Sequence, residues 1–207
     1  MKQITFIVIL AASAIIISCN NNASSGHDHA GMDHSDSMPM HDGAAGDETM
    51  KTVSVTFTSV DPGVSAFMKS MMQEYLLVKN ALINEKISEA AQVSGRMHEM
   101  MKGFDKSLLT AEQKTTYDKV AEDLLEQAEH ISENNDIEHK RSHFSMMSSD
   151  MYSLVKAFGA GMPVYHDHCP MARDNQGAMW LSEHKDIRNP YFGDKMMTCG
   201  TVEEIIQ

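Results

Sequence analysis

The chain contains 207 residues, of which 42% are hydrophobic and 22% are charged, and its 17 basic and 29 acidic side chains give a net charge of −12. This acidic balance argues against nucleic acid and anionic lipid as partners. Methionine and histidine are frequent, with 19 and 11 residues, although methionine is ordinarily a minor gap-filling residue of protein cores. A helical core explains some of the methionines, but not those that lie among Gly, Ser and Asp near the N-terminus.

The first 18 residues predict a lipoprotein signal peptide. Lys2 supplies a positive charge, residues 4–17 are mainly apolar, and the sequence Ile-Ile-Ser-Cys that ends at Cys19 resembles the bacterial lipobox. An apolar run of this length is short for a transmembrane helix, which needs roughly 20 residues. We therefore expect cleavage before Cys19, lipidation of its side chain, and a membrane-anchored lipoprotein that faces the periplasm of a bacterial envelope. An uncleaved anchor is the alternative.

Residues 19–52 predict a disordered tether, because residues 20–52 contain no Val, Ile, Leu, Phe, Tyr or Trp that a core might bury. Imidazole and thioether groups recur in it between acidic residues, and a histidine-rich tract in an exported linker indicates metal capture. A solvated low-complexity spacer is the alternative. The candidate metal ligands of the tether are His27, His29, Met32, His34, Met38, Met40 and His41.

Four segments with helical periodicity follow the tether. Asp61 and Pro62 form a good N-cap and first turn for the first helix. Thr110 followed by Gln113 predicts a capping box for the third helix. Glycines after Phe158 are expected to end the fourth helix. The helices are predicted over about residues 62–83, 84–101, 111–131 and 135–158.

Short connections between these helices favour an all-α fold, an up-down four-helix bundle. The alternation of Val53, Val55 and Phe57 with polar residues indicates a short extended stretch before the bundle. No long periodic stretch remains after Pro163, so we expect an irregular C-terminal arm that wraps the bundle. Residues 53–207 are then one domain with a single core.

The C-terminal arm concentrates donor atoms for soft metals in two short stretches that lie about thirty residues apart. Thiolate, thioether and imidazole are donors that suit copper better than they suit hard cations. We therefore expect a copper site here, with Asp167 as an acceptor for an imidazole N–H. The candidate ligands are His166, His168, Cys169, Met171, Met196, Met197 and Cys199.

Cys169 and Cys199 also have a second interpretation. If Cys19 carries lipid, they are the remaining pair of cysteines, and an oxidising periplasm permits a disulfide between them. A bridge that closes such a loop would stabilise the fold by roughly 3–4 kcal/mol in the chain-entropy model. Spacing alone does not distinguish a disulfide from a pair of metal ligands, so both interpretations stay open.

The fourth predicted helix carries further donors. His139, His143, Met147 and Met151 follow one another at intervals of four residues, which places them along one face. Two imidazoles one turn apart are an unusual way to fill a core, so we expect His143 and Met147 to belong to a metal site. Packing in the core is the alternative for the two methionines.

Several motifs of the arm resemble the signature of a bacterial domain of unknown function. They are Cys169-Pro170-Met171-Ala172, residues 177–182 (GAMWLS), residues 187–193 (IRNPYFG) and Met196-Met197-Thr198-Cys199-Gly200. The helical part is similar from about residue 65, especially over residues 136–141 (DIEHKR). That family occurs as exported lipoproteins and as the terminal domain of some periplasmic adaptor proteins of copper/silver efflux pumps. The resemblance implies a helical-bundle domain linked to copper or silver handling.

Together these features predict a membrane-tethered periplasmic lipoprotein that captures or relays copper and is not an enzyme. Thioethers and a thiolate favour Cu(I), whereas the histidines also suit Cu(II) or Zn(II), and Ag(I) is a further alternative. The expected partners are the metal ion, the membrane through the lipid anchor, and an efflux adaptor or other copper-handling envelope protein. The rival function is a protein-interaction module, a disulfide-stapled bundle that docks on such an adaptor and binds metal only through its tether.

Overall fold

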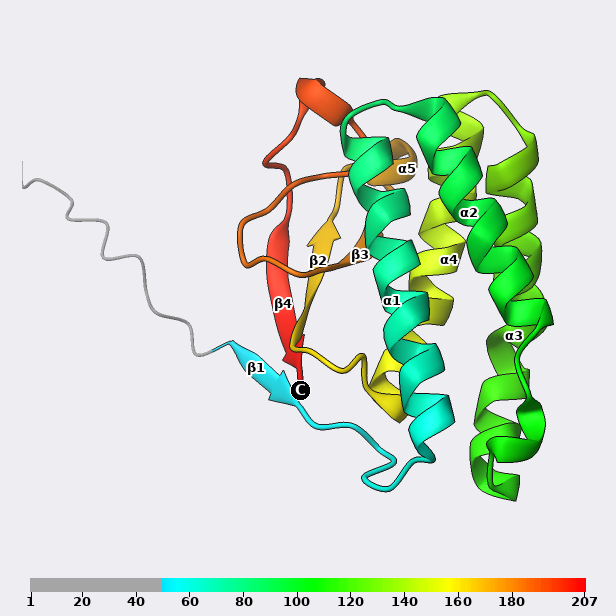
Figure 1. Cartoon of the computed structure of the whole chain (residues 1–207). Helices are drawn as coiled ribbons and strands as arrows, with labels where there is room; N and C mark the ends of the chain where they lie inside the picture. The colour runs from blue at the N-terminus through cyan, green and yellow to red at the C-terminus, as the bar shows by residue number, and fades with distance from the viewer. Residues whose placement is uncertain (1–49) are drawn as a thin grey trace, which may run out of the picture. The chain divides into compact units, whose positions relative to one another are not determined.

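The computed structural model describes residues 50–207, in which four long helices pack as a bundle beside a four-stranded sheet (Figure 1). The helices are α1 (Pro62–Ile83), α2 (Ile87–Lys102), α3 (Ala111–Glu133) and α4 (Ile137–Phe158). Each helix packs against the next along the chain, and α4 also contacts α1. The four predicted helices are therefore confirmed. The signal peptide, Cys19 and the candidate ligands of the tether lie outside the described residues.

The helices begin where their capping residues predict. The Asp61 side chain accepts a hydrogen bond from the Gly63 amide at the start of α1, and Thr110 and Gln113 form the expected capping box of α3. At α4 the cap is Asp136, whose carboxylate accepts from the His139 amide at 2.7 Å. This cap starts α4 two residues later than predicted and fixes the position of its first turn.

The segment predicted as an irregular arm instead supplies three strands of a sheet, so the purely all-α fold class was wrong. The strands are β1 (Lys51–Val53), β2 (Val164–Cys169), β3 (Ala178–Ser182) and β4 (Thr201–Ile206). Their order in the sheet is β1-β4-β2-β3, with β1 parallel to β4 and the other two pairs antiparallel. The sheet contacts the bundle mainly through β3 and α4. Short helical turns η1 (Lys106–Leu108), α5 (Ala172–Asn175) and η2 (Gly193–Lys195) lie in the connections.

Polar side chains in the strands account for the missed sheet. In β2 the two histidines and Asp167 interrupt the apolar pattern that usually marks a strand, although His166 and Asp167 are buried. In β4 the register shifts between the pairs His166–Glu204 and Asp167–Val202, so Glu203 is skipped by the pairing. A bulge of this kind breaks the alternation of faces on which strand prediction depends. Pairing with distant strands, and not local pattern, holds these segments extended.

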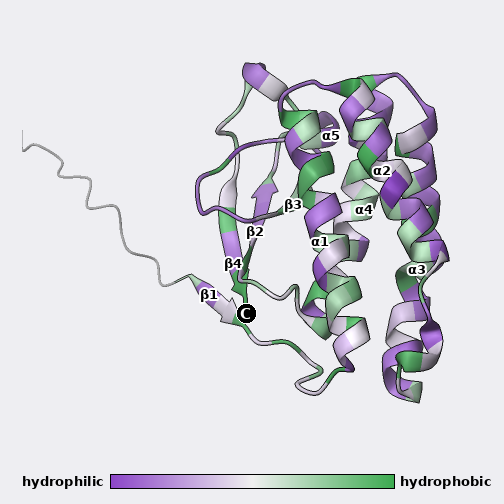
Figure 2. Ribbon diagram, in the orientation of Figure 1, coloured by the Kyte–Doolittle hydropathy of each residue, from purple (hydrophilic) through white to green (hydrophobic). Residues whose placement is uncertain are grey.

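The core of the bundle is rich in methionine. Apolar and polar residues alternate around the helices in Figure 2, and the apolar faces meet inside the bundle. Tyr75 links three elements, because its hydroxyl lies 2.7 Å from Ser148 Oγ of α4 and accepts from the Leu181 amide of β3 at 3.0 Å. Packing therefore explains many of the methionines. Those in the core are Met68, Met71, Met72, Met97, Met101, Met147 and Met151.

Among residues 50–207, none of the helices combines the length and the apolar character that are needed to cross a bilayer.

Candidate metal centre

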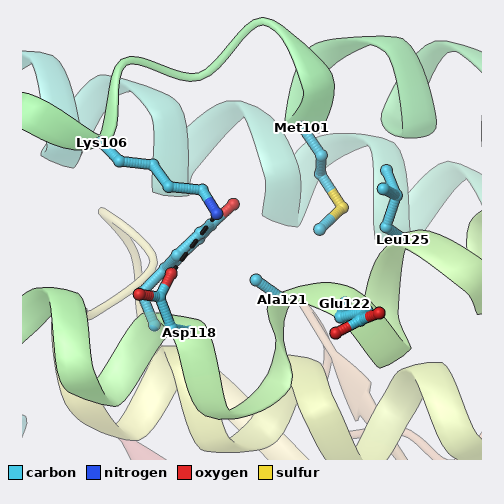
Figure 3. Close-up of a pocket in the computed structure, with 7 residues that line it drawn as sticks. Met101, Lys106, Asp118, Ala121, Glu122 and Leu125 are labelled. Carbon is cyan, nitrogen blue, oxygen red and sulfur yellow. Dashed lines mark hydrogen bonds and ion pairs between the residues drawn. The ribbon is translucent and has the colours of Figure 1, made fainter.

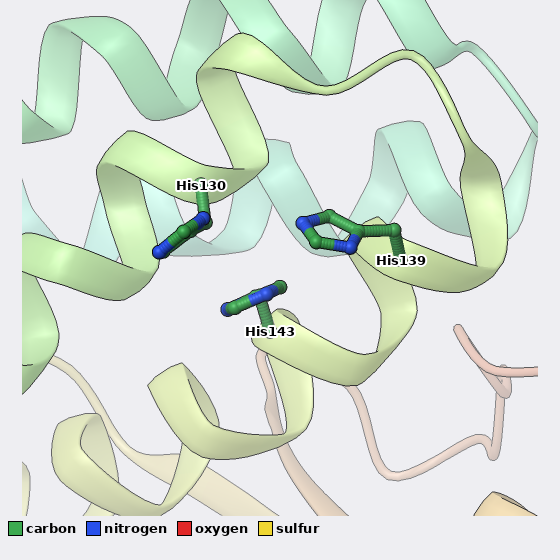
Figure 4. A group of neighbouring side chains, drawn as sticks. All are labelled: His130, His139 and His143. Atoms are coloured by element: carbon green, nitrogen blue, oxygen red, sulfur yellow. The ribbon is translucent and has the colours of Figure 1, made fainter.

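Three histidines meet where α3 and α4 lie side by side (Figure 4). His130 comes from the last turn of α3, and His139 and His143 come from the first two turns of α4. One nitrogen from each ring can be chosen so that the three atoms lie within 4.8 Å of one another. The centroid of the His143 ring is 4.4 Å from that of His130 and 4.4 Å from that of His139. We refer to these three residues as the histidine cluster.

The local sequence explains why the histidine cluster forms. Residues 134–136 are a short connection, and the Asp136 cap starts α4 immediately after it, so the two helices run back along each other. His139 and His143 are one turn apart and share a face of α4. His130 lies about as far before the connection as they lie after it, and it therefore meets them across the seam between the helices.

A neighbouring amide orients one of the rings. His143 Nδ1 lies 2.7 Å from the Oε1 atom of buried Gln127. Because an amide oxygen only accepts, the hydrogen of neutral His143 is on Nδ1 and its Nε2 lone pair is the one that can bind a metal. A second contact of this kind is typical of metal-binding histidines, whose other ring N–H usually donates to a carbonyl, carboxylate or water.

Burial and neighbouring charges favour the neutral form of His143, which is the form that binds metal. Burial lowers the pKa of His143, and the neighbouring rings of His139 and His130 lower it further. Glu126 acts in the opposite direction on the same pKa, and its Oε1 atom lies 3.6 Å from His130 Nε2. A lowered pKa leaves more of the imidazole neutral near pH 7, and only the neutral form has a lone pair to give to a metal.

The sequence identified two members of the histidine cluster and missed the third. His139 and His143 were identified from their spacing, but nothing in the sequence of the third helix singled out His130. The signal that was available is the hairpin itself, because residues at similar distances from a short helix–helix connection face each other in an antiparallel pair.

Met147 does not join His143 as predicted. The predicted stripe continues in steps of four residues, and each step advances about 40° around a helix of 3.6 residues per turn. The half-buried His143 therefore lies on the seam, whereas Met147 and Met151 are fully buried in the core. The stripe of four donors is divided between the seam and the core, and the burial of the two methionines agrees with the alternative of core packing.

The predicted copper site of the arm is divided as well. Successive side chains of a strand point to opposite faces, so His166 and His168 share one face of β2, and Cys169 lies on the other. His166 Nδ1 lies 3.4 Å and His168 Nδ1 3.5 Å from the carboxylate oxygens of Glu203, the residue that the β-bulge leaves unpaired. His166 also stacks on Tyr152 of α4, with ring centroids 4.5 Å apart. The two imidazoles are thus engaged with a carboxylate and not with the cysteine.

Asp167 lies away from both histidines. It faces Trp180, its cross-strand partner on β3, and has no exposed surface. Burial raises the pKa of the Asp167 carboxyl to about 7, against the opposing attraction of Lys79. The prediction that Asp167 orients an imidazole was therefore wrong, because the alternation of the strand turns it to the other face.

Cys169 and Cys199 lie side by side, with 2.6 Å between their sulfur atoms. Buried Asn189 holds the loop that contains Cys199 in place, since its side-chain amide donates to the Cys199 carbonyl at 2.7 Å. Two sulfurs that bind one tetrahedral ion at 2.3 Å are about 3.8 Å apart, so this separation is shorter than a shared ion requires. The adjacent Cys169 raises the pKa of the Cys199 thiol to about 11, which disfavours the thiolate that a metal binds.

The three methionines of the predicted arm site occupy irregular positions around this cysteine pair. Met171 is exposed at the start of α5, and Met196 and Met197 are half-buried in the loop before Cys199. The backbone carbonyls of Met196 and Met197 form hydrogen bonds within the loop. The Met197 carbonyl accepts from the Asn189 amide, and the Met196 carbonyl accepts from the Cys199 amide. The loop is thus ordered by its backbone hydrogen bonds.

A separate cleft of about 380 Å³ opens between α2, η1 and α3 (Figure 3). Met101, Tyr117 and Leu125 line it, and Lys106 forms an ion pair with Asp118 at 3.3 Å across its end. Lys106 Nζ also lies 5.4 Å from the centre of the Tyr117 ring. None of the predicted metal ligands lines this cleft, so it is distinct from the histidine cluster.

Comparison with known proteins agrees with the expectation of a domain of unknown function. Residues 71–163 match a family described as "Protein of unknown function (DUF3347)". The match runs from the first half of α1 to the connection before β2, so it includes the histidine cluster and ends before the cysteine pair. No curated protein and no solved structure matches the chain.

Proposed function

We propose that this protein is a membrane-tethered, periplasmic metal-binding lipoprotein that captures or relays copper and does not catalyse a reaction. The observation that carries the proposal is the histidine cluster, in which three imidazoles converge and one is oriented by Gln127. Copper binds most tightly among the divalent first-row metals at a given nitrogen site, with zinc and nickel below it. Metal handling in the envelope is therefore the function that the donor set supports best.

The sequence supports the same function from two further directions. The lipobox-like residues before Cys19 favour export and anchoring, and the histidines and methionines of the tether sequence are a second candidate set of donors. The resemblance to a domain found in copper/silver efflux adaptors supplies a setting in which a captured ion is handed to a partner. Two donor sets in one chain suit a relay, because sets of different composition hold the ion with different affinities.

A titration of the full, metal-free chain tests the proposal. The number of Cu(II) or Zn(II) ions bound per chain should fall by one in His130→Ala. The tether and the arm are the same in both proteins, so any ions that they bind contribute equally to the two counts. His184→Ala is the matched control, since His184 is an exposed histidine of the same domain outside the histidine cluster. Equal stoichiometry and affinity in wild type and His130→Ala would remove the basis of the proposal.

A protein-interaction module is the second candidate, and the cysteine pair favours it. Sulfur atoms 2.6 Å apart are placed to form a disulfide with little movement, and that bridge would staple the sheet to its loop. In that case the arm presents a rigid surface for another envelope protein and does not bind Cu(I). Alkylation of the folded, oxidised protein followed by mass measurement distinguishes the two uses, because bridged cysteines do not react.

A further inference from the structure

Glu126 is the acidic residue closest to the histidine cluster. It precedes His130 by one turn of α3, and its Oε1 atom lies 3.6 Å from His130 Nε2. It is also the carboxylate whose charge acts on His143 from across the seam. The side chain is 60% exposed, so it can change rotamer without disturbing the core. A carboxylate therefore stands beside the three imidazoles.

We propose that the histidine cluster binds a divalent ion, Cu(II) or Zn(II), through its three imidazoles and the Glu126 carboxylate, in preference to a monovalent ion such as Cu(I) or Ag(I). This inference rests on the proposed function and names the oxidation state of the ion that the same site takes. It differs from the prediction made from the sequence, where thiolate and thioether donors favoured Cu(I).

A tetrahedral ion sets the spacing that the four donors must reach. Zinc binds histidine nitrogen and carboxylate oxygen at about 2.1 Å, and two such donors of a tetrahedral ion lie about 3.4 Å apart. The Glu126 oxygen and His130 Nε2 are already separated by 3.6 Å. The three imidazole nitrogens lie within 4.8 Å of one another, and Glu126 is outside that group, so the rings and the exposed Glu126 side chain must reorient before all four donors reach this spacing.

Charge favours the divalent ion. Three neutral imidazoles do not neutralise any of the charge of an ion bound in the half-buried seam. One carboxylate neutralises one unit of that charge. At equal distance, a carboxylate attracts a divalent ion twice as strongly as a monovalent one, because the Coulomb energy is proportional to the charge. Glu126 therefore discriminates between the two oxidation states of copper, and the neutral imidazoles do so less.

Sulfur donors are turned away from the histidine cluster. Met147 is fully buried in the core, and the cysteine pair lies on the sheet. Met146, an exposed methionine one turn after His143 on α4, is the thioether that would shift the preference toward Cu(I) or Ag(I) if it took part. It is therefore included in the test.

The test compares two ions in the full chain. Competition titrations measure the affinities of Zn(II) and Ag(I) for the site that is lost in His130→Ala. Ag(I) serves as the probe of monovalent binding because, unlike Cu(I), it does not oxidise. Glu126→Gln should weaken Zn(II) binding by at least about tenfold, as the loss of a ligand or of its partner commonly does, and should leave Ag(I) binding within about twofold. Glu122→Gln is the matched control, because it removes the same charge from α3 on the side of the cleft (Figure 3).

The outcomes separate this inference from the proposed function. Zn(II) binding that depends on His130 but not on Glu126 overturns the inference and leaves the metal site intact. Tighter binding of Ag(I) than of Zn(II), lost in Met146→Leu, also overturns it and makes the site one for monovalent ions. If His130→Ala removes no ion of either kind, the proposed function itself fails.

Discussion

His143 on α4 and His168 on β2 are both half-buried imidazoles, but their neighbours differ in kind. His143 has a neutral amide on one nitrogen and two further imidazoles around the other. His168 lies beside the Glu203 carboxylate, which it shares with His166. The first arrangement brings one nitrogen from each of three rings within 4.8 Å of one another, whereas in the described residues His166, His168 and Glu203 form no such group of three ligand atoms. The helices therefore gather three candidate ligand atoms at this spacing, whereas the sheet does not.

The comparison teaches that donor type in the sequence is a weaker guide than the element that presents the donor. On a helix, residues four apart stay close to one face and a neighbouring helix can add a third ligand to them. In a strand, adjacent residues point to opposite faces, so Cys169 of β2 does not face the same side as His166 and His168. The densest cluster in the sequence is thus not the best-formed site.

The largest expected effect concerns the cysteine pair. If Cys169 and Cys199 are bridged, replacing Cys169 with Ser should lower the free energy of unfolding by roughly 3–4 kcal/mol. Urea denaturation of the oxidised protein measures it, and reduction of the wild type is the matched control because it breaks the same bond. A Cys169→Ser variant as stable as the oxidised wild type would show that the bridge is absent.

Asp167 should make the sheet side of the molecule sensitive to pH. Its folded pKa of about 7 lies above the unfolded value, so the folded state binds the proton more tightly. Ionisation of the carboxylate destabilises the fold. The free energy of unfolding therefore falls as the pH rises from about 4 to about 7 and stays at the lower value above that range. Asp167→Asn should remove roughly 3 kcal/mol of pH dependence, measured as the difference between the variant and the wild type at pH 4.5 and pH 8. An unchanged pH profile would mean that Asp167 is ionised at little expense.

A bound metal ion should stabilise the folded protein through the histidine cluster of the helices and not through the sheet. An ion present at 100 times its dissociation constant raises the free energy of unfolding by about 2.7 kcal/mol when it binds only the folded state. Thermal unfolding with and without Zn(II) should show this shift in wild type and in Cys199→Ser, and lose it in His143→Ala. Survival of the whole shift in His143→Ala would place the ion elsewhere.

A smaller effect is expected at Gln127, which orients His143 without contacting the ion. Gln127→Leu should weaken Zn(II) binding by about tenfold, because partners of ligating histidines commonly contribute a factor of 10–100. Gln127→Glu keeps an acceptor at the same position and should retain the affinity. Equal weakening in both variants would indicate a packing defect in place of a lost orientation.

The smallest effect is predicted for Met171. It is exposed at the start of α5 and lies outside the core. Met171→Leu should change the free energy of unfolding by no more than about 0.5 kcal/mol, as most surface substitutions do, and should leave the Cu(I) affinity of the reduced protein unchanged. A clear drop in Cu(I) affinity would restore Met171 as a ligand of the arm.

The helices were predictable because each carries its own signals. The cap at Asp61, the capping box at Thr110 and the glycine after Phe158 act over a few residues, and the apolar period runs through each helix. The sheet was not predictable, since β1 lies more than a hundred residues from β4, its only partner, and both carry polar residues. Local patterns do not contain that pairing.

The candidate site was predictable in part for the same reason. The spacing of His139 and His143 is a local feature of one helix, and it was recognised. His130 required the position of a second helix, and the interior placement of Met147 required the rotation of α4 about its axis. The adjacency of Cys169 and Cys199 was foreseen, because both interpretations of the pair, a disulfide and a shared metal site, bring the two sulfur atoms together.

The short connection between α3 and α4 has a consequence for the order of folding. All three histidines and Glu126 lie within residues 126–143, a stretch of two helix ends and one turn. Contacts this local close quickly, because little chain entropy is lost in bringing the ends together. The two cysteines instead come together only when β4 (Thr201–Ile206) pairs with β2. If the protein is exported and binds metal as proposed, we expect the histidine cluster to be assembled before the thiols meet, so that an ion captured early is held away from them while they are still reactive.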